Sequence, residues 1–138
     1  MLSVKNERGS LFAINNFDEL PFLPKRLFVV SDVPSSAVRG KHAHYETQQV
    51  LFCLKGSIQI TITDKNGVHS IFLSEGEKYF HDRLEWAEID FENRDTLMLV
   101  VCSTDFDEDD YIRDLEQFKG IISLNKGMVQ RRSKNDCK

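Results

Sequence analysis

The sequence predicts an all-β domain, either a barrel or a sandwich of short antiparallel strands. Between positions 57 and 64, Ile58, Ile60 and Ile62 alternate with polar residues, as in a strand with one buried face. Lys65-Asn66-Gly67 separates this run from a second apolar run, a pattern typical of a β-hairpin. Turn residues, not helical segments, separate the other short apolar runs, which favours a barrel or sandwich over βαβ units.

The elements follow in chain order from the same signals. Short β-rich runs bounded by turn residues predict strands over residues 10–15, 26–31, 49–54, 57–64, 68–73 and 96–103. The sequence Ser74-Glu75-Gly76-Glu77 is a further turn after the hairpin.

The chain changes character near its end. The acidic residues 107–110 precede a segment in which Tyr111, Leu115 and Phe118 would share one face of a helix. Acidic residues favour a helix N-terminus, so we interpret the cluster as a solvated helix cap in preference to a metal site. Gly120 is expected to end this helix.

Length and composition limit the domain count and the partners. The 138 residues suit a single domain, over residues 1–125, and residues 126–138 are expected to be a disordered basic tail. A formal net charge of −4 argues against nucleic acid as a partner. No apolar run is long enough to span a membrane, so no membrane partner is expected. Cys53 and Cys102 lie in apolar runs as expected for buried thiols, and three cysteines without paired spacing favour a cytoplasmic location.

The pair His42 and His44 is the principal candidate for a functional site. Successive side chains of a strand point to opposite faces, so residues i and i+2 share a face. The polar residue Gln49 then opens an apolar run that ends at the turn residue Gly56. Two imidazoles on one sheet face, just before an apolar strand, predict a site inside a small barrel.

This spacing of His-x-His, Gln49 and Gly56 resembles the first motif of the cupins. The finer pattern is similar to one cupin branch, the dTDP-4-keto-6-deoxyglucose 3,4-ketoisomerases, which are WxcM-like sugar-nucleotide isomerases. The resemblance covers roughly residues 7 to 120. It rests on Arg8-Gly9-Ser10-Leu11, Pro21-Phe22, Lys25-Arg26, Arg39-Gly40-Lys41-His42-Ala43-His44, Gln49-Val50-Leu51, Cys53-Leu54, Gly56, Trp86 and Asp110-Tyr111-Ile112-Arg113.

The resemblance implies a cupin fold, a double-stranded β-helix or jelly-roll barrel, with a short C-terminal helix. It implies an isomerase that moves the ketone of a dTDP-4-keto-6-deoxyhexose from C4 to C3 in nucleotide-sugar biosynthesis for surface polysaccharides. It also implies a homodimer, in which an N-terminal strand such as residues 10–15 lends an edge to the partner.

A metal cofactor is not expected. A typical cupin metal site adds an acidic ligand and a third histidine, from a Pro-x-Gly motif followed by His, and this chain has no such string. Gln49 stands in place of the acidic ligand, and a neutral amide is a poor ligand for such ions. His81 is the alternative third ligand, and His69 is interpreted as a surface residue.

Two metal-free histidines point to proton transfer near neutral pH. The proton on C3, next to the C4 ketone, is acidic enough for a histidine base if the developing oxyanion is stabilised. The catalytic residues are therefore His42 and His44, one as the base at C3 and the other as the acid or proton carrier. The sequence leaves open which histidine has which role, and the reaction needs no cofactor.

The candidate substrate-binding residues are Arg26, Arg39, Gln49, Phe28 and Trp86. The resemblance places Arg26 and Arg39 near the barrel interior, where arginine suits diphosphate recognition. Gln49 is a candidate partner for a sugar hydroxyl or for His42. Trp86 is either a stacking surface for the ligand or a core residue.

The chain also departs from the pattern of this family. Phe28 and Val29 stand where the family carries two tyrosines, and Ala87 follows Trp86 where histidine is frequent. Only one of Phe28 and Val29 can face the sugar, and Phe28 is favoured because its ring keeps the shape of tyrosine. The departures keep two alternatives open: a non-catalytic sugar-nucleotide-binding cupin, and another cupin enzyme such as a 3,5-epimerase-like isomerase or a metal oxygenase.

Overall fold

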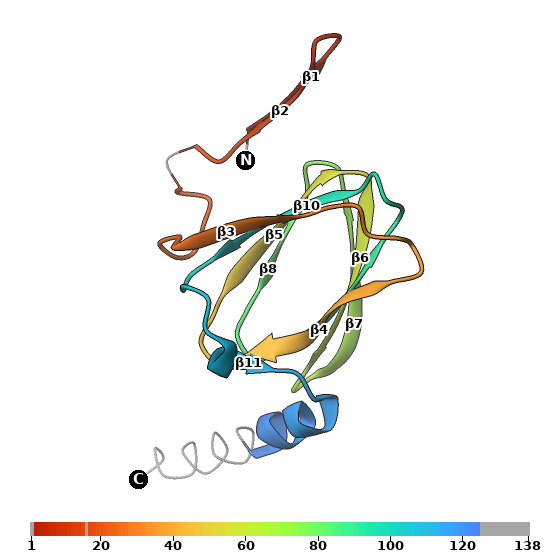
Figure 1. Ribbon diagram of the computed structural model, residues 1–138. Coiled ribbons are helices and arrows are strands. Elements are labelled where there is room, and N and C mark those ends of the chain that lie inside the picture. The colour runs from red at the N-terminus through yellow and green to blue at the C-terminus, as the bar shows by residue number, and fades with distance from the viewer. Residues whose placement is uncertain (1, 16, 125–138) are drawn as a thin grey trace.

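The computed structural model describes residues 2–15 and 17–124, and in it two antiparallel sheets face each other as a barrel (Figure 1). The four-stranded sheet has the order β3-β10-β5-β8, and the five-stranded sheet has the order β11-β4-β9-β6-β7. A separate hairpin, β1-β2, stands outside the barrel. The strands are β1 (Leu2–Asn6), β2 (Gly9–Ala13), β3 (Arg26–Val30), β4 (Val38–His44), β5 (Gln49–Lys55), β6 (Ser57–Asp64), β7 (Gly67–Ser74), β8 (Lys78–His81), β9 (Trp86–Phe91), β10 (Leu97–Cys102) and β11 (Tyr111–Ile112).

The hairpin of β6 and β7 forms as the sequence predicts. The two strands pair along their whole length, from Ser57 opposite Ser74 to Asp64 opposite Gly67. Gly67 has a φ of 123°, a region that side chains disfavour, and so closes the turn without strain. The predicted turn at residues 74–77 is also present, with the Glu77 amide donating to the Ser74 carbonyl at 3.0 Å.

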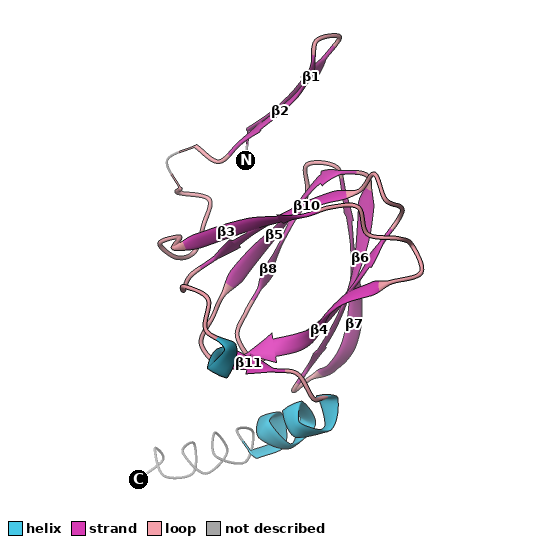
Figure 2. Cartoon of the chain, viewed as in Figure 1, coloured by secondary structure: helices cyan, strands magenta, loops and turns pink. Residues whose placement is uncertain are grey.

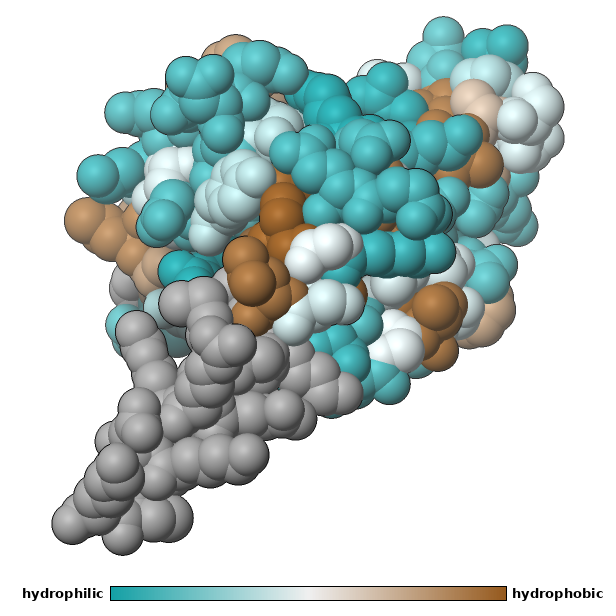
Figure 3. Space-filling model, turned by 90° about the horizontal axis from the view of Figure 1, so that it is seen from below, coloured by the Kyte–Doolittle hydropathy of each residue, from teal (hydrophilic) through white to brown (hydrophobic). Residues whose placement is uncertain are grey.

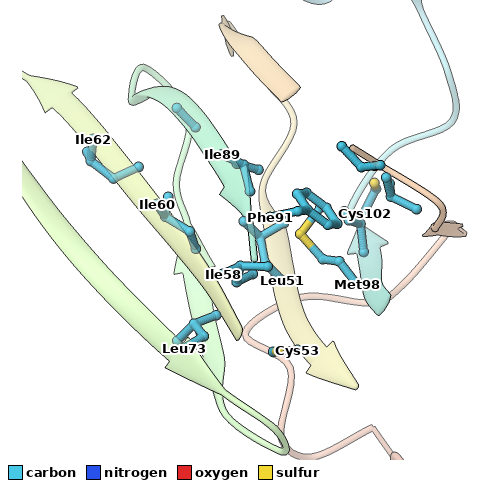
Figure 4. Packing of buried hydrophobic residues seen from close by; sticks show 14 residues of the cluster. Leu51, Cys53, Ile58, Ile60, Ile62, Leu73, Ile89, Phe91, Met98 and Cys102 are labelled. Carbon is cyan, nitrogen blue, oxygen red and sulfur yellow. The ribbon is translucent and has the colours of Figure 1, made fainter. Parts of the chain in front are cut away.

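The main core lies between the two sheets. The three isoleucines of β6 are buried in one cluster with residues of the neighbouring strand β9 and with residues of β5 and β10 in the opposite sheet (Figure 4). The predicted alternation is therefore confirmed, and so is the burial of the thiols of Cys53 and Cys102. The cluster comprises Val30, Val33, Leu51, Cys53, Ile58, Ile60, Ile62, Leu73, Ala87, Ile89, Phe91, Met98, Val100 and Cys102.

Two smaller clusters cover the outer faces of the sheets. Val50, Phe52 and Val101 alternate with the core residues of β5 and β10, so they point outward, and Leu20 of the N-terminal segment packs on them. A C-terminal helix over residues 115–124 lies beside the five-stranded sheet (Figure 2). Its Phe118 clusters with Trp86, Ala43 and Ile112. This helix therefore packs on the outer face of β4 and β9.

All six predicted strands are present, with ends shifted by at most two residues. The predicted strands do not include β1, β8, β9 or β11, and no bounds were predicted for β4, which begins at Val38. β8 and β11 are too short to show a period, and their strand character comes from pairing with neighbours distant in sequence, such as Tyr111 opposite His44. β9 does alternate, with Glu88 and Asp90 between Ala87, Ile89 and Phe91, so its period of two was a strand signal that the predictions left out.

A helix near the C-terminus is present as predicted, but both its first and its last residue differ from the prediction. Tyr111 lies in strand β11 opposite His44, because the acidic residues cap only a short 3₁₀ turn, Glu108–Asp110. The α-helix begins after Asp114, whose side chain accepts from the Gln117 amide at 2.9 Å, and it continues through Gly120. The predicted tail, 126–138, lies outside the described residues.

The surface is mixed in character. Seen from the end that carries the C-terminal helix, hydrophilic residues predominate and apolar groups form several separate patches (Figure 3). Within the described residues, no helix has the length and apolarity needed to cross a membrane.

Candidate active site

A cavity of about 400 Å³ opens between the two sheets. Its walls are apolar where the core strands line it and polar where β4, β5, β8 and β11 contribute their side chains. The lining residues are Phe28, Val30, Val38, Arg39, Gly40, His42, Gln49, Leu51, His81, Ala87, Ile89, Met98, Val100, Tyr111 and Arg113.

An irregularity in β4 precedes the two histidines. The pairing of β4 with β9 shifts between Gly40 and His42, and both Gly40 and Lys41 have positive φ, 83° and 54°. A Cβ at position 40 would meet the Ala87 carbonyl oxygen at 2.8 Å, so only glycine fits there. Beyond this bulge the ring centroids of His42 and His44 are 4.9 Å apart, which confirms that the two side chains share a face.

His42 lines the cavity and has one defined tautomer. Its Nδ1 lies 2.9 Å from the Gly40 carbonyl oxygen, which can only accept, so Nδ1 carries the hydrogen. Burial lowers the pKa of His42 below its ordinary value of 6.5, and the guanidiniums of Arg113 and Arg39 act in the same direction. The neutral ring therefore keeps an unprotonated Nε2, the form that a general base requires.

His44 lies behind His42 and does not line the cavity. Its side chain is only 1% exposed, and its Nδ1 donates to Asp110 Oδ2 at 3.1 Å. Burial lowers the pKa of His44 to about 4, with the neighbouring His42 and His81 adding to the effect. The expectation that both imidazoles line the site is therefore wrong for His44, whose buried Nε2 has no hydrogen-bond partner among the described residues.

Asp110 corrects the interpretation of the acidic cluster as a solvated cap. Its carboxylate is buried and accepts from the amides of Glu46 and Thr47, from the Thr47 hydroxyl and from His44. Burial favours its neutral form, but these hydrogen bonds hold the pKa of Asp110 below its usual value. Asp110 is thus an ionised anchor for His44.

Tyr111 completes this wall of the cavity. Its ring centroid lies 4.4 Å from that of His44 and 5.0 Å from that of His42. The Arg113 guanidinium lies over the same ring, 4.2 Å from its centroid, and is held by two bonds to Glu108, of 2.7 and 3.0 Å. The string Asp110-Tyr111-Ile112-Arg113 was a signal for this site in the sequence. Because the segment was interpreted as the start of a helix, its contact with the histidines was not predicted.

The structure brings three of the predicted binding residues to the cavity. Phe28 lines it while the neighbouring Val29 is 54% exposed on the other face, as the strand alternation predicts. Arg39 lines it from an exposed position on β4. Gln49 lines it from a buried position on β5, with His81 beside it.

Two predicted binding residues lie elsewhere. Arg26 is not part of the cavity lining, and its guanidinium carbon lies 5.6 and 5.5 Å from the ring centroids of Phe28 and Phe106. Trp86 is buried against Phe118, with its Nε1 donating to Glu88 at 3.2 Å. Trp86 points toward the helix because β9 alternates and its neighbour Ala87 faces the cavity, so it is a core residue and not a stacking surface for a ligand.

The site offers proton transfer more readily than metal binding. Within the residues that the structure describes, no three His, Cys, Asp or Glu side chains are grouped so as to hold a metal ion. His81 Nε2 lies 2.7 Å from the Glu85 carbonyl and its Nδ1 lies 3.1 Å from Gln49, so both of its nitrogens are occupied. The absence of a metal or another cofactor stays a prediction. His69 is exposed on β7, as expected.

Comparison with known proteins identifies the family of this chain. The family model described as FdtA: WxcM-like, C-terminal matches residues 1–123. The chain is 36% identical over 119 residues to a TDP-4-oxo-6-deoxy-α-D-glucose-3,4-oxoisomerase of Aneurinibacillus thermoaerophilus, covering 86% of each protein.

Solved structures show the same fold. A 3,4-ketoisomerase from Helicobacter canadensis superposes with a TM-score of 0.79 at 33% identity, over 88% of this chain and 92% of that one. The sugar 3,4-ketoisomerase QdtA from Thermoanaerobacterium thermosaccharolyticum, solved with TDP, gives 0.81 at 27% identity, over 90% and 91%. A mutant of QdtA was solved with TDP-4-keto-6-deoxyglucose, with a TM-score of 0.81, 27% identity and coverage of 89% and 90%. From the match over nearly its whole length, the chain belongs to the WxcM-like, C-terminal (FdtA) family of cupin-fold proteins.

Proposed function

We propose that this protein is a cofactor-free 3,4-ketoisomerase of a dTDP-4-keto-6-deoxyhexose, acting in nucleotide-sugar biosynthesis. The observation that carries the proposal is the pair of neutral histidines in edge-to-face contact, of which one lines a cavity and the other is anchored by Asp110. The relatives support the substrate class, because they are 3,4-ketoisomerases and one was solved with TDP-4-keto-6-deoxyglucose.

In the proposed reaction, His42 Nε2 removes the proton from C3 of the sugar. The electrons of the C3–H bond form a C3–C4 double bond, and the C4 ketone oxygen becomes the oxyanion of an enediolate. The proton held on His42 Nε2 is then delivered to C4, and the hydroxyl proton moves from O3 to the C4 oxyanion, which leaves the ketone at C3 and a hydroxyl at C4. His42 is assigned as the base because it lines the cavity, and His44 is assigned to carry protons behind it.

Arg39 is the proposed ligand of the diphosphate, with Arg113 beside it on the cavity wall. Arg26 takes a supporting role, because it lies against Phe28 and interacts with Tyr111. The Tyr111 phenol is the proposed donor to the sugar, since Phe28 has no hydroxyl to offer.

Incubation with dTDP-4-keto-6-deoxyglucose in deuterated water tests the proposed function. We expect formation of the 3-keto isomer with deuterium at C3 or C4, read by mass spectrometry and NMR. Deuterium at C5 would indicate an epimerase, and no exchange would indicate a binding module. Either of the last two results would contradict the proposal.

The pH dependence of kcat/KM follows from the lowered pKa of His42. A base must be unprotonated, and below its pKa the ring carries an extra proton. Since this pKa lies below 6.5, we expect kcat/KM to stay level between about pH 6.5 and 8 and to fall only at lower pH. An acid limb centred above pH 7 would contradict the assignment of His42.

Phe28→Tyr should restore a hydroxyl that the family pattern carries at this position. One positioned hydrogen bond contributes roughly 0.5–1.5 kcal/mol, so turnover should rise by about two- to twelve-fold or the ratio of C4 products should change. Phe72→Tyr is the matched control, because Phe72 is 70% exposed on β7 and outside the cavity. An unchanged rate and product mixture in folded Phe28→Tyr would show that Phe28 does not occupy the tyrosine's place.

We also expect a homodimer, since the structure leaves strand surfaces that a second copy would cover. The hairpin β1-β2 extends away from the barrel (Figure 1), and Lys5 forms one long ion pair with Glu75, of 3.5 Å. A two-stranded hairpin is marginally stable in water by itself. On the edge strand β3, Leu27 and Val29 point outward and are 67% and 54% exposed.

Light scattering at micromolar concentration should give twice the chain mass. Leu27→Asp should weaken this dimer, whereas Val68→Asp, at an equally exposed position on β7, should leave it intact. A stable monomer of the unmodified protein would contradict the expectation.

A further inference from the structure

Four polar side chains form a row across the four-stranded sheet. Arg26 of β3 is the cross-strand neighbour of Cys102 of β10, Cys102 is the neighbour of Gln49 of β5, and Gln49 is the neighbour of His81 of β8. The row is connected: Arg26 Nη2 lies 3.6 Å from Cys102 Sγ, and the Gln49 amide lies 3.4 Å from that sulfur and 3.1 Å from His81 Nδ1. Gln49 and His81 line the cavity, on a sheet different from that of His42.

One end of the row fixes the direction of its hydrogen bonds. His81 Nε2 lies 2.7 Å from the Glu85 carbonyl oxygen, and a carbonyl only accepts, so Nε2 carries the hydrogen. His81 is 2% exposed, and its burial lowers its pKa to about 4, so the ring is neutral at pH 7. Nδ1 is therefore an acceptor and needs a donor.

Gln49 supplies that donor only in one orientation of its amide. With Oε1 at 3.1 Å from Nδ1, two acceptors would oppose each other inside the barrel. A half-turn about the last side-chain bond places Nε2 there and moves no heavy-atom position. Oε1 then faces Cys102, whose thiol can donate to it. Each hydrogen-bond donor between the Glu85 carbonyl and Cys102 then faces an acceptor.

An amide nitrogen has two hydrogens, and His81 takes only one of them. We propose that the second N–H of Gln49 is directed by His81 to the sugar oxygen that becomes negative in the enediolate. Gln49 is then a catalytic donor, and His81 is the positioning residue that holds its nitrogen toward the cavity. The role rests on the proposed ketoisomerase function.

The residue type agrees with this role. A donor aimed at the developing oxyanion stabilises the transition state more than the ground state. A carboxylate at position 49 would only accept and would repel the enediolate. Glutamine has nearly the same shape as glutamate and supplies an N–H without charge. A donor role at the sugar would therefore require an amide, not a carboxylate, at position 49.

Nitrogen-15 NMR of the histidines tests the orientation without any substrate. We expect His81 as the neutral tautomer with hydrogen on Nε2 and an unprotonated Nδ1 that accepts a hydrogen bond. In Gln49→Glu, the carboxylate accepts from Nδ1 instead, so His81 should bind a second proton and its pKa should rise. A hydrogen on Nδ1 of neutral wild-type His81 would overturn the proposal, and this result is independent of the enzyme's activity.

Steady-state kinetics test the catalytic role. Gln49→Glu and Gln49→Met should each lower kcat by about 10²- to 10³-fold, the usual effect of losing one oxyanion donor. The affinity for dTDP should not change, because the donor acts at the sugar and not at the diphosphate. Gln48→Met is the matched control, since Gln48 bonds to Asp82 and lies outside the cavity, and it should keep the wild-type rate.

The outcomes separate this inference from the proposed function. If the wild-type protein isomerises the keto-sugar and folded Gln49→Met keeps kcat within about three-fold, Gln49 is no donor to the transition state, since such a loss costs far more. If the wild-type protein does not isomerise the sugar, the proposed function fails. In that case the tautomer of His81 still decides the orientation of the Gln49 amide.

Discussion

Replacing His42 by asparagine is expected to lower kcat/KM for isomerisation by about 10²- to 10⁴-fold, the usual effect of losing a general base. The His42 ring reaches the cavity with an unprotonated Nε2, and an asparagine side chain cannot take a proton there. The exchange of deuterium into C3 should be lost together with product formation, because both depend on removal of the same proton.

The stability of this variant should change little, because His42 is only partly buried and its hydrogen bond among the described residues is to the nearby Gly40 carbonyl. His69→Asn is the control, since His69 is exposed on β7 and lies outside the cavity. A His42→Asn protein that kept more than about a tenth of the wild-type rate would remove His42 as an essential proton carrier. By contrast, His44→Asn should lose stability as well as activity, because it removes the buried hydrogen bond from His44 to Asp110.

The largest expected effect on stability is that of Asp110→Asn. The carboxylate accepts hydrogen bonds from two backbone amides, one hydroxyl and one imidazole, and the residue is 8% exposed. An asparagine offers one oxygen, and its amino group would face donors. Leaving buried donors unmatched and removing an ionised acceptor of four hydrogen bonds should lower the free energy of unfolding by about 3 kcal/mol.

Urea unfolding measures this change, which should appear as a lower midpoint at an unchanged slope. Asp109→Asn is a close control, because it removes the same charge from the neighbouring exposed residue. The isomerase activity of Asp110→Asn should also fall, since the Nδ1 hydrogen of His44 would lose its acceptor. Equal stabilities of the two variants would contradict the anchoring role of Asp110.

The sequence by itself determined the local parts of this protein. Ile58, Ile60 and Ile62 predict a half-buried strand because the period of a strand is two, and this holds wherever the strand lies. The same local rule placed His42 and His44 on one face, and it placed Phe28, in preference to Val29, toward the cavity. The resemblance to the family added the class of reaction, through strings that run along most of the chain.

Only the tertiary structure decided which of these residues meet. Tyr111 and Asp110 have a helical pattern in the sequence, yet pairing with β4 draws Tyr111 into a strand opposite His44 and buries Asp110. The pairing also joins residues more than sixty positions apart, and no local period encodes such a partner. Burial then separated the two histidines, because solvent exposure depends on everything that packs around a side chain. For that reason the sequence supplied two equivalent imidazoles, and the fold made one of them face the cavity and enclosed the other.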